Sequence, residues 1–472
     1  MSTDRRSKAG TAPYQSEQTL RKWAILGIVA IVAGMIALVL VQYGTPTKFP
    51  SRWGYFSRAG TVYFQHVVLG RTLPPLNNAD FGRYLKLCLG VAWAGYALAV
   101  VAGLQGATLR PRTVVAVSVG VCLTASVLSP SSLCKDVYGY VAYGRLQAFY
   151  GLNPYAYCQK YIRHFHDPTV RFLFWNIKCP YGPLWTNLSI AIVAMFRMSG
   201  LFWQVVAFKL LASACLIASA VTGKAIANHF HAGQGNLTFL AIALNPLFLI
   251  EGPGSAHNEF LMMGLALLAV LLVLKGKWTA GLVSLGLSVS VKFITLAILP
   301  WLVIRRLRGR PLREQAPLAA LMVLIALTPI VLLYVPLWDG GAPIKGMQSQ
   351  SACGLKATTG FQAAGLFLEN AGAPKVVASA AVATLSRWWL ILLYVGLTAW
   401  IWRSKDQANW MVAWIVFSGC VAFFVVKARF PWYFVCPWML TLTRWDRAYR
   451  FLSCACFGFG MVLTMFYGVA RY

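Results

Sequence analysis

The amino-acid sequence predicts an all-α polytopic membrane protein, and three properties of its composition indicate this class. Of the 472 residues, 58% are hydrophobic and 11% are charged, and the mean hydropathy is +0.63. A soluble domain is closer to half apolar and a quarter charged. Aromatic residues make up 14% of the chain, which excludes a disordered protein. The 42 Lys and Arg residues outnumber the 12 Asp and Glu residues, for a net charge of +30, but soluble nucleic-acid binders with such a charge lack long apolar runs.

The apolar runs define the predicted membrane spans. A transmembrane helix needs about 20 mainly apolar residues, and shorter ones are accepted inside a bundle, so we expect a bundle of about 13 helices. Residues 279–304 are either one kinked helix or two short helices that meet at Lys292. The predicted spans, in order along the chain, are 24–42, 84–105, 113–129, 202–223, 236–250, 259–274, 279–291, 293–304, 315–336, 384–402, 409–427, 431–443 and 451–469.

Clusters of Lys and Arg in short loops mark the cytoplasmic side of a membrane protein. Five such residues before the first span make residues 1–22 a cytoplasmic tail. For the later clusters to stay on the same side, the apolar stretch 183–198 has to lie along the outer surface. The resulting segments are an N-terminal two-helix segment (23–112), a core (113–336) with a large outer loop (130–201), a second outer loop (337–383) and C-terminal helices (384–472).

About half of the cations remain on the outer side in this arrangement, where the topology rule does not explain them. Snorkelling contacts with lipid headgroups account for such residues in general. The alternative is that some of them line a site for an anionic, phosphate-bearing lipid. Two outer cysteines, Cys158 and Cys179, would form a disulfide if that compartment is oxidising. No nucleotide-binding glycine motif and no zinc-peptidase motif occurs in the sequence.

Acidic residues are so few that candidates for acid–base chemistry on the outer face can be found by elimination. Asp136 is the best of them, because it directly follows the third predicted span. If residues 136–149 form a helix, Asp136, Tyr140 and Tyr143 share one face, which suits a sugar or a lipid headgroup. The alternative is that Asp136 only caps this helix. The carboxylates predicted outside the membrane are Asp136, Asp167, Glu251, Glu259, Asp339 and Glu369.

A second group of polar residues lies between two apolar helices, where the chain is broken by Gly and Pro. His257, Asn258 and Glu259 follow this break and open the next helix. Irregular backbone at membrane depth is tolerated only where protein or water covers it. These side chains either bind sugar hydroxyls or position a base, or Asn258 and Glu259 simply cap and stabilise the helix start.

Lys292 interrupts an otherwise apolar stretch, and ionisable residues inside spans are functional by default. It either binds the phosphate of a lipid or snorkels to the interface. Tyr181, in a Tyr-Gly-Pro-Leu turn, and Trp432 and Tyr433, in a Phe-Pro-Trp-Tyr turn, are aromatic residues next to proline at the outer surface. An interfacial aromatic belt is the alternative explanation for them.

The ordered set of these motifs resembles the GT-C superfamily of integral membrane glycosyltransferases, and specifically bacterial polyprenyl-phosphomannose-dependent α-mannosyltransferases. The matching elements extend over roughly residues 113–445, in the expected order. They are Asp136-Val137-Tyr138-Gly139-Tyr140 with Gly144-Arg145, Leu152-Asn153-Pro154-Tyr155, Tyr181-Gly182-Pro183-Leu184, Asn245-Pro246, Ala256-His257-Asn258-Glu259, Val291-Lys292 and Pro431-Trp432-Tyr433.

The resemblance implies a GT-C-like bundle with in-plane helices in the first outer loop, and Asp136 as general base. It also implies a hexose donor, with mannose on polyprenyl phosphate, and a glycan or glycolipid acceptor on the outer face of the cell membrane. Nucleic acid is not an expected partner, and no cofactor is expected. Lys135 stands where many members have a second acid, so we predict no metal ligands. The predicted substrate-binding residues are Tyr140, Arg145, Tyr181, His257, Asn258, Glu259, Lys292, Arg429, Trp432 and Tyr433.

Two alternatives stay open at this stage. One is a GT-C transferase that uses another polyprenyl-phosphate sugar, such as glucose or arabinose, because Glu259 stands where the resemblance places an aspartate. The other is a lipid transporter. Transporters usually contain internal repeats, and the sequence shows none, which favours the enzyme.

Overall fold

The computed structural model describes residues 16–46, 58–131, 133–173, 177–344, 365, 367–406, 408–422 and 431–465. Within these ranges all regular structure is helical and there is no strand, so the predicted all-α fold is confirmed. Five of the described helices are long and apolar enough to cross a membrane, and each coincides with a predicted span. They are α1 (Glu17–Tyr43), α3 (Asn78–Leu104), α4 (Pro111–Leu128), α7 (Gly200–Phe230) and α13 (Leu312–Tyr334).

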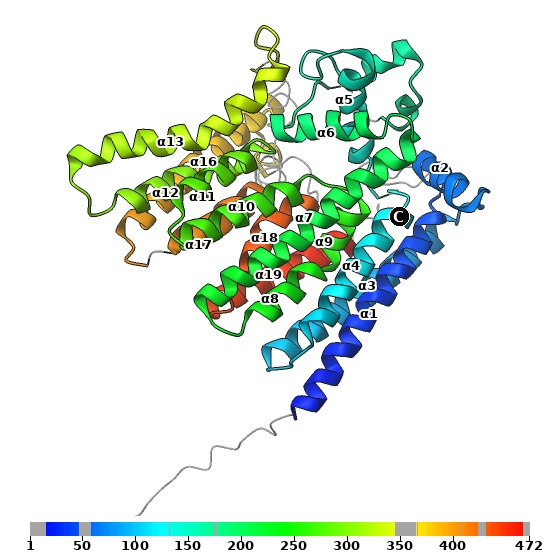
Figure 1. The fold of residues 1–472 in the computed structure, drawn as a ribbon, viewed down its shortest axis with the longest axis horizontal. Coiled ribbons are helices and arrows are strands. Elements are labelled where there is room, and N and C mark those ends of the chain that lie inside the picture. The colour runs from blue at the N-terminus through cyan, green and yellow to red at the C-terminus, as the bar shows by residue number, and fades with distance from the viewer. Residues whose placement is uncertain are drawn as a thin grey trace, which may run out of the picture.

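The N-terminal helices form one side of the bundle (Figure 1). α1 and α3 pack closely because glycines face each other: a Cβ on Gly27 would lie 2.5 Å from the carbonyl oxygen of Gly95. The short helix α2 (Arg58–Leu69) lies between them in sequence. The turn from α3 to α4, which contains Arg110, lies at the same end of the bundle as the start of α1.

The segment after α4 lies beyond the opposite end of the long helices (Figure 1). It contains α5 (Asp136–Tyr150), two 3-10 turns, η1 (Gln159–Phe165) and η2 (Pro168–Phe172), and α6 (Pro183–Met195). The helix predicted at 136–149 is therefore confirmed, and it ends at Gly151, whose positive φ of 66° ends the helix. α6 crosses over the ends of the bundle, and its 13 residues are too few to span a membrane alone.

The centre of the bundle is built from α7 and a series of shorter helices. α8 (Gly235–Ala243) and the segment Pro246–Gly254 meet at a 48° bend, because Pro246 lacks an N–H and the side chain of Asn245 caps the next turn. α11 (Trp278–Val289) and α12 (Ile298–Leu307) are separate helices that meet near Lys292, which decides between the two possibilities for 279–304. The remaining elements here are α9 (Pro246–Leu249), the π-helical turn η3 (Ile250–Gly254), α10 (Glu259–Leu274) and η4 (Phe293–Ala297).

The C-terminal helices return to the N-terminal side. The ring of Trp438 in α18 (Val435–Thr441) stacks on Trp93 in α3, with ring centroids 5.5 Å apart. The chain after α13 continues through η5 (Val335–Leu337), α16 (Lys375–Arg403), α17 (Asn409–Cys420), η7 (Pro431–Phe434), α18 (Val435–Thr441) and α19 (Arg447–Met465).

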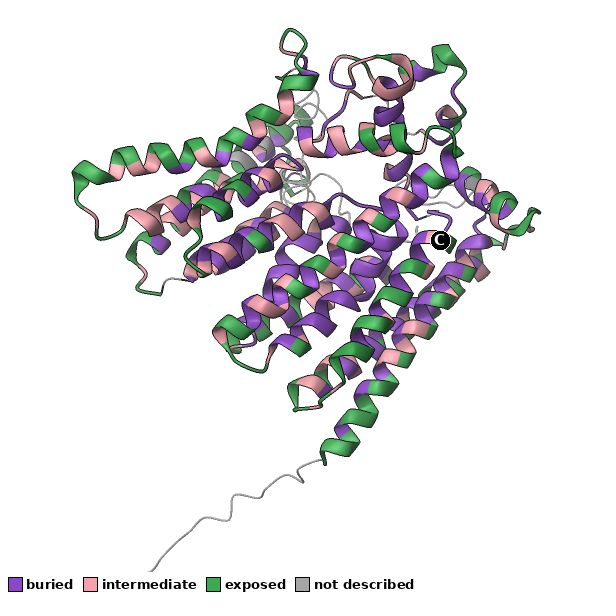
Figure 2. Ribbon diagram, in the orientation of Figure 1, coloured by how far each residue is buried: buried purple, intermediate pink, exposed green. Residues whose placement is uncertain are grey.

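The distribution of burial identifies the lipid-facing surfaces. Buried residues concentrate on the central helices, while α1, α3 and α13 carry many exposed residues (Figure 2). Several of these exposed residues are large and apolar, such as Leu40, Leu87 and Leu324, which are each more than 60% exposed. Contiguous apolar surface of this extent marks a surface that contacts another apolar phase. The fold is thus that of a polytopic membrane protein.

Candidate active site

Four segments at the breaks between helices place predicted site residues close together at the end of the bundle where α5 lies. Asp136 is the first residue of α5, His257 lies in the turn before α10, and Glu259 is the first residue of α10. Lys292 lies between α11 and η4, and Trp432 lies in η7. Segments more than 100 residues apart in the chain therefore contribute to one site.

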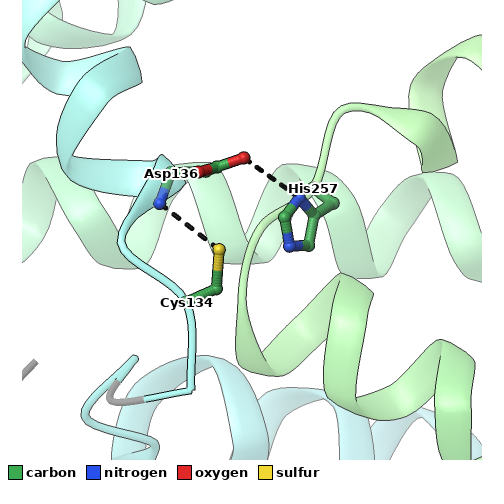
Figure 3. A group of neighbouring side chains, drawn as sticks. All are labelled: Cys134, Asp136 and His257. Carbon is green, nitrogen blue, oxygen red and sulfur yellow. Dashed lines mark hydrogen bonds and ion pairs between the residues drawn. The ribbon is translucent and has the colours of Figure 1, made fainter. Parts of the chain in front are cut away.

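Asp136 faces His257 across the gap between α5 and the turn before α10 (Figure 3). Its Oδ2 atom lies 3.8 Å from Nδ1 of His257, and its side chain is 13% exposed. The N-cap of α5 is Lys135, and no side chain makes a capping hydrogen bond there. Burial, with the charge of Glu259 in addition and that of Lys292 in opposition, raises the pKa of Asp136 to about 6. The carboxylate of Asp136 can therefore be reached from outside the protein, and its pKa is suited to proton uptake near neutral pH.

The ammonium group of Lys292 is held by an acid and by two aromatic rings. Its Nζ forms an ion pair with Oε1 of Glu259, and it lies 5.4 Å from the ring centroid of Tyr433 and 5.9 Å from that of Tyr181. The second carboxylate oxygen of Glu259 lies 3.9 Å from Nδ1 of His257. Aromatic faces attract cations. The arrangement therefore fixes one positive charge in the same group as Asp136 and His257.

Two further predicted residues lie near this group. Asn258 is fully buried, its side chain does not cap α10, and neither its amide nitrogen nor its amide oxygen makes a hydrogen bond within the described chain. Buried polar atoms without a partner are rare, and a bound substrate is one way to satisfy them. Tyr140 packs edge-on against Tyr181, with ring centroids 5.2 Å apart. The ring of His257 stacks on Trp432 at 4.1 Å.

The Tyr-Gly-Pro-Leu turn explains how Lys292 is positioned. The backbone N–H of Gly182 donates to the carbonyl oxygen of Val291 at 3.1 Å, and that of Leu184 donates to Ser290 at 2.9 Å. A Cβ on Gly182 would collide with the Ser290 carbonyl group. Glycine is required here because the two backbones touch, and the contact brings Tyr181 beside Lys292.

Not every predicted residue belongs to this group of side chains. Arg145 is paired elsewhere: its Nε donates to Asp167 at 2.7 Å and its Nη1 to Gln204 at 3.0 Å. Arg429 lies outside the described residues. The predicted disulfide is wrong for this structure, since Cys158 and Cys179 are both free thiols.

Three buried residues with polar contacts were not among the predicted site residues. Glu251 is fully buried, and its Oε2 lies 3.1 Å from Nε2 of His257. Lys209, also fully buried, donates from Nζ to the carbonyl oxygen of Ser129, which caps the end of α4. Cys134 accepts the N–H of Asp136 at 3.4 Å. Glu251 had a signal in the sequence, as a carboxylate in a Gly/Pro-broken turn, whereas no pattern distinguishes Cys134 from the other cysteines of the predicted outer loops.

Cys134, Asp136 and His257 also form the group of described residues whose donor atoms a metal ion could share, since these atoms lie within 4.8 Å of one another (Figure 3). The ammonium of Lys292, through its pairing with Glu259, already supplies a fixed positive charge to this group.

The fold and the site define a class: a polytopic helical membrane protein with carboxylate, imidazole and ammonium groups gathered at one end of the bundle. Comparison with protein families narrows this class. The family model described as alpha-(1->6)-mannopyranosyltransferase, N-terminal domain, matches residues 57–308, which is more than half of the chain. The chain belongs to this family, and the matched region contains Asp136, His257 and Lys292.

Two curated relatives agree with this assignment. The chain is 29% identical over 258 residues to alpha-(1->6)-mannopyranosyltransferase A of Mycobacterium tuberculosis, covering 52% of this chain and 46% of the relative. It is 32% identical over 207 residues to the protein of the same name from Corynebacterium glutamicum, covering 41% of this chain and 38% of the relative. The chain thus matches less than half the length of each relative. No solved structure matches it.

Proposed function

We propose that the protein transfers mannose from polyprenyl-phosphate mannose to a glycan or glycolipid acceptor on the extracytoplasmic face of the membrane. The family membership supports mannosyl transfer, and the relatives' name supports an α-(1→6) linkage in the product. One structural observation carries the proposal: Asp136, with a pKa raised to about 6, lies 3.8 Å from His257, which also contacts Glu259, the ion-pair partner of Lys292.

In this mechanism Asp136 takes the proton from the acceptor hydroxyl group as its oxygen attacks the anomeric carbon of the donor sugar. The new carbon–oxygen bond forms on the face opposite the bond to phosphate, which breaks. Polyprenyl phosphate leaves with the bonding electron pair. A single displacement inverts the anomeric centre, so a β-linked donor yields an α-linked product.

The leaving phosphate gains negative charge in the transition state, and fixed positive charge at that position lowers the barrier. Lys292 is suited to this role because its charge lowers the pKa of Asp136 and its side chain is 20% exposed, so a substrate can reach it. The aromatic rings of Tyr181 and Tyr433 limit where its ammonium can move. We assign Lys292 to the donor phosphate, and we retain Arg429 as a predicted second cation.

Charge and chain direction support an extracytoplasmic location of the site. The start of α1, which follows the basic tail, and the turn between α3 and α4 lie at one end of the bundle, and α5 lies beyond the other (Figure 1). Cationic loops favour the cytoplasm. We therefore assign Asp136 to the outer side, where polyprenyl-linked sugars and envelope glycans are available together.

The test uses purified protein in vesicles with labelled polyprenyl-phosphate mannose, glucose or arabinose and a cell-envelope lipid extract as acceptor. We expect labelled product from the mannose donor, with an α anomeric configuration. Transfer from glucose or arabinose alone would replace the donor assignment. Movement of labelled lipid across the vesicle without transfer would identify a transporter and overturn the proposal.

A further inference from the structure

Glu251 is a buried acid whose carboxylate group makes no hydrogen bond that would stabilise the described part of the fold. It lies in the π-helical turn η3, which contains Pro253, and its exposed fraction is 0%. Neither carboxylate oxygen makes a regular hydrogen bond within the described chain. Nε2 of His257 lies 3.1 Å from Oε2, within hydrogen-bonding distance, although the pair does not meet the angular geometry of a hydrogen bond. A buried acid in this state requires an explanation.

The other nitrogen of the same ring decides which atom carries the proton. Nδ1 of His257 faces carboxylate oxygens of Asp136 at 3.8 Å and of Glu259 at 3.9 Å. Burial, together with the charge of Lys292, lowers the pKa of His257 well below 6.5, so the ring is neutral and has one donor and one acceptor nitrogen. Because Nδ1 faces two acceptors, the proton belongs on Nδ1. Nε2 is then the acceptor.

An acceptor at Nε2 determines the state of Glu251. An ionised Glu251 would direct a second acceptor and an unpaired buried charge at Nε2, which is costly. A neutral Glu251 can donate its O–H to Nε2 instead. The local charges agree: Glu259 is paired with Lys292, so a neutral Glu251 leaves Asp136 as the one unpaired carboxylate of these three acids.

We propose that Glu251 is a positioning residue held as a neutral carboxylic acid, which donates to Nε2 of His257 and thereby fixes Nδ1–H towards Asp136. The inference rests on the proposed function, in which Asp136 is the base. The proton of the acceptor hydroxyl goes to Asp136, and neither His257 nor Glu251 gains or loses a proton in the reaction. Trp432, stacked on the ring at 4.1 Å, keeps the imidazole plane in place.

Substitutions at Glu251 separate a neutral donor from a charged group. Glu251→Gln keeps a hydrogen-bond donor on a side chain of the same length, so we expect kcat to stay within about threefold of that of the original protein. Loss of the hydrogen bond would lower kcat by more than this. Glu251→Ala removes the donor, so we expect kcat to fall by about 10- to 100-fold, with the KM for the donor lipid changed little. The acid limb of the pH profile should also move to higher pH in Glu251→Ala, since Asp136 loses an oriented N–H that favours its ionised form.

A merely structural role for Glu251 would not move the pH profile. If Glu251→Ala does not fold, the Gln variant alone decides, together with an infrared measurement above the pKa of Asp136. There we expect a carbonyl band of a protonated carboxyl group in the original protein and its loss in Glu251→Gln. A folded Glu251→Gln that is as inactive as an Asp136→Asn variant would overturn the inference, as would the absence of that band. Activity retained in Asp136→Asn would instead reject the proposed function, so the two failures are distinguishable.

Discussion

The raised pKa of Asp136 predicts a specific pH dependence for sugar transfer. A general base works in its ionised form, so the rate should rise with pH as Asp136 loses its proton. With a pKa of about 6, kcat/KM is expected to be half-maximal near that pH and to fall about tenfold for each further unit of acidification. The measurement is kcat/KM for the labelled donor between about pH 4.5 and 8. An Asp with the ordinary pKa of about 3.9 would be ionised throughout that range and would give a nearly flat profile.

Removing the charge of Glu259 should shift the pKa of Asp136 in a known direction. Glu259 raises the pKa of Asp136 and Lys292 lowers it. Glu259→Gln removes the first effect and releases Lys292 from its ion pair. Both changes move the acid limb to lower pH. Glu314→Gln is the matched control, because Glu314 pairs with Arg310 at the exposed start of α13 and its loss should leave the limb in place. A limb that stays fixed in Glu259→Gln, or moves to higher pH, would refute the electrostatic reasoning.

Three further substitutions test the parts of the site. Lys292→Ala should raise the KM for the donor about tenfold or more, since a hydrogen bond to a charged group is worth about 1.5–3 kcal/mol; an unchanged donor KM would remove Lys292 from the phosphate site. Gly182→Ala should lower thermal stability by about 1–3 kcal/mol, because the new Cβ meets the Ser290 carbonyl group; a thermal scan in detergent with no shift would contradict this contact. Arg145→Ala should destabilise the fold by about 3 kcal/mol or more, because the buried Asp167 keeps its hydrogen bonds from Tyr150 and Thr169 but loses its ion-pair partner. A raised donor KM with unchanged stability would instead make Arg145 a substrate-binding residue, as the sequence resemblance implied.

The sequence was most informative where a charged residue stands in or beside an apolar segment. Asp136 and Lys292 stand out because charged residues are costly near or inside apolar segments. The α5 helix was predictable within one residue at its end, since Gly151 follows an uninterrupted run that begins after a span. The five helices that are long and apolar enough to cross a membrane were also predictable, because length and hydropathy are local properties of the sequence.

Interactions between distant segments were not predictable in this way. The ion pair between Glu259 and Lys292, and the contact of Gly182 with Val291, join residues that no local pattern relates. Arg145 was predicted to bind substrate because it follows the predicted base within one motif. The two residues are nine positions apart in the same helix, and the side chain of Arg145 pairs with Asp167 instead. The bend between α8 and α9 depends on the cap that the side chain of Asn245 forms. An Asn-Pro pair is equally compatible with a simple turn, so the sequence alone did not predict the bend.

The central claim is that Asp136 is the base of mannosyl transfer, and Asp136→Asn tests it most directly. The asparagine keeps the shape of the side chain but cannot take up the proton, so the rate should fall by about 10²- to 10⁴-fold. The measurement is transfer of label from polyprenyl-phosphate mannose by the purified variant in vesicles, with thermal unfolding and donor binding as controls. We expect a variant that folds and binds the donor but transfers almost no mannose. Transfer at the original rate by this variant would contradict the claim.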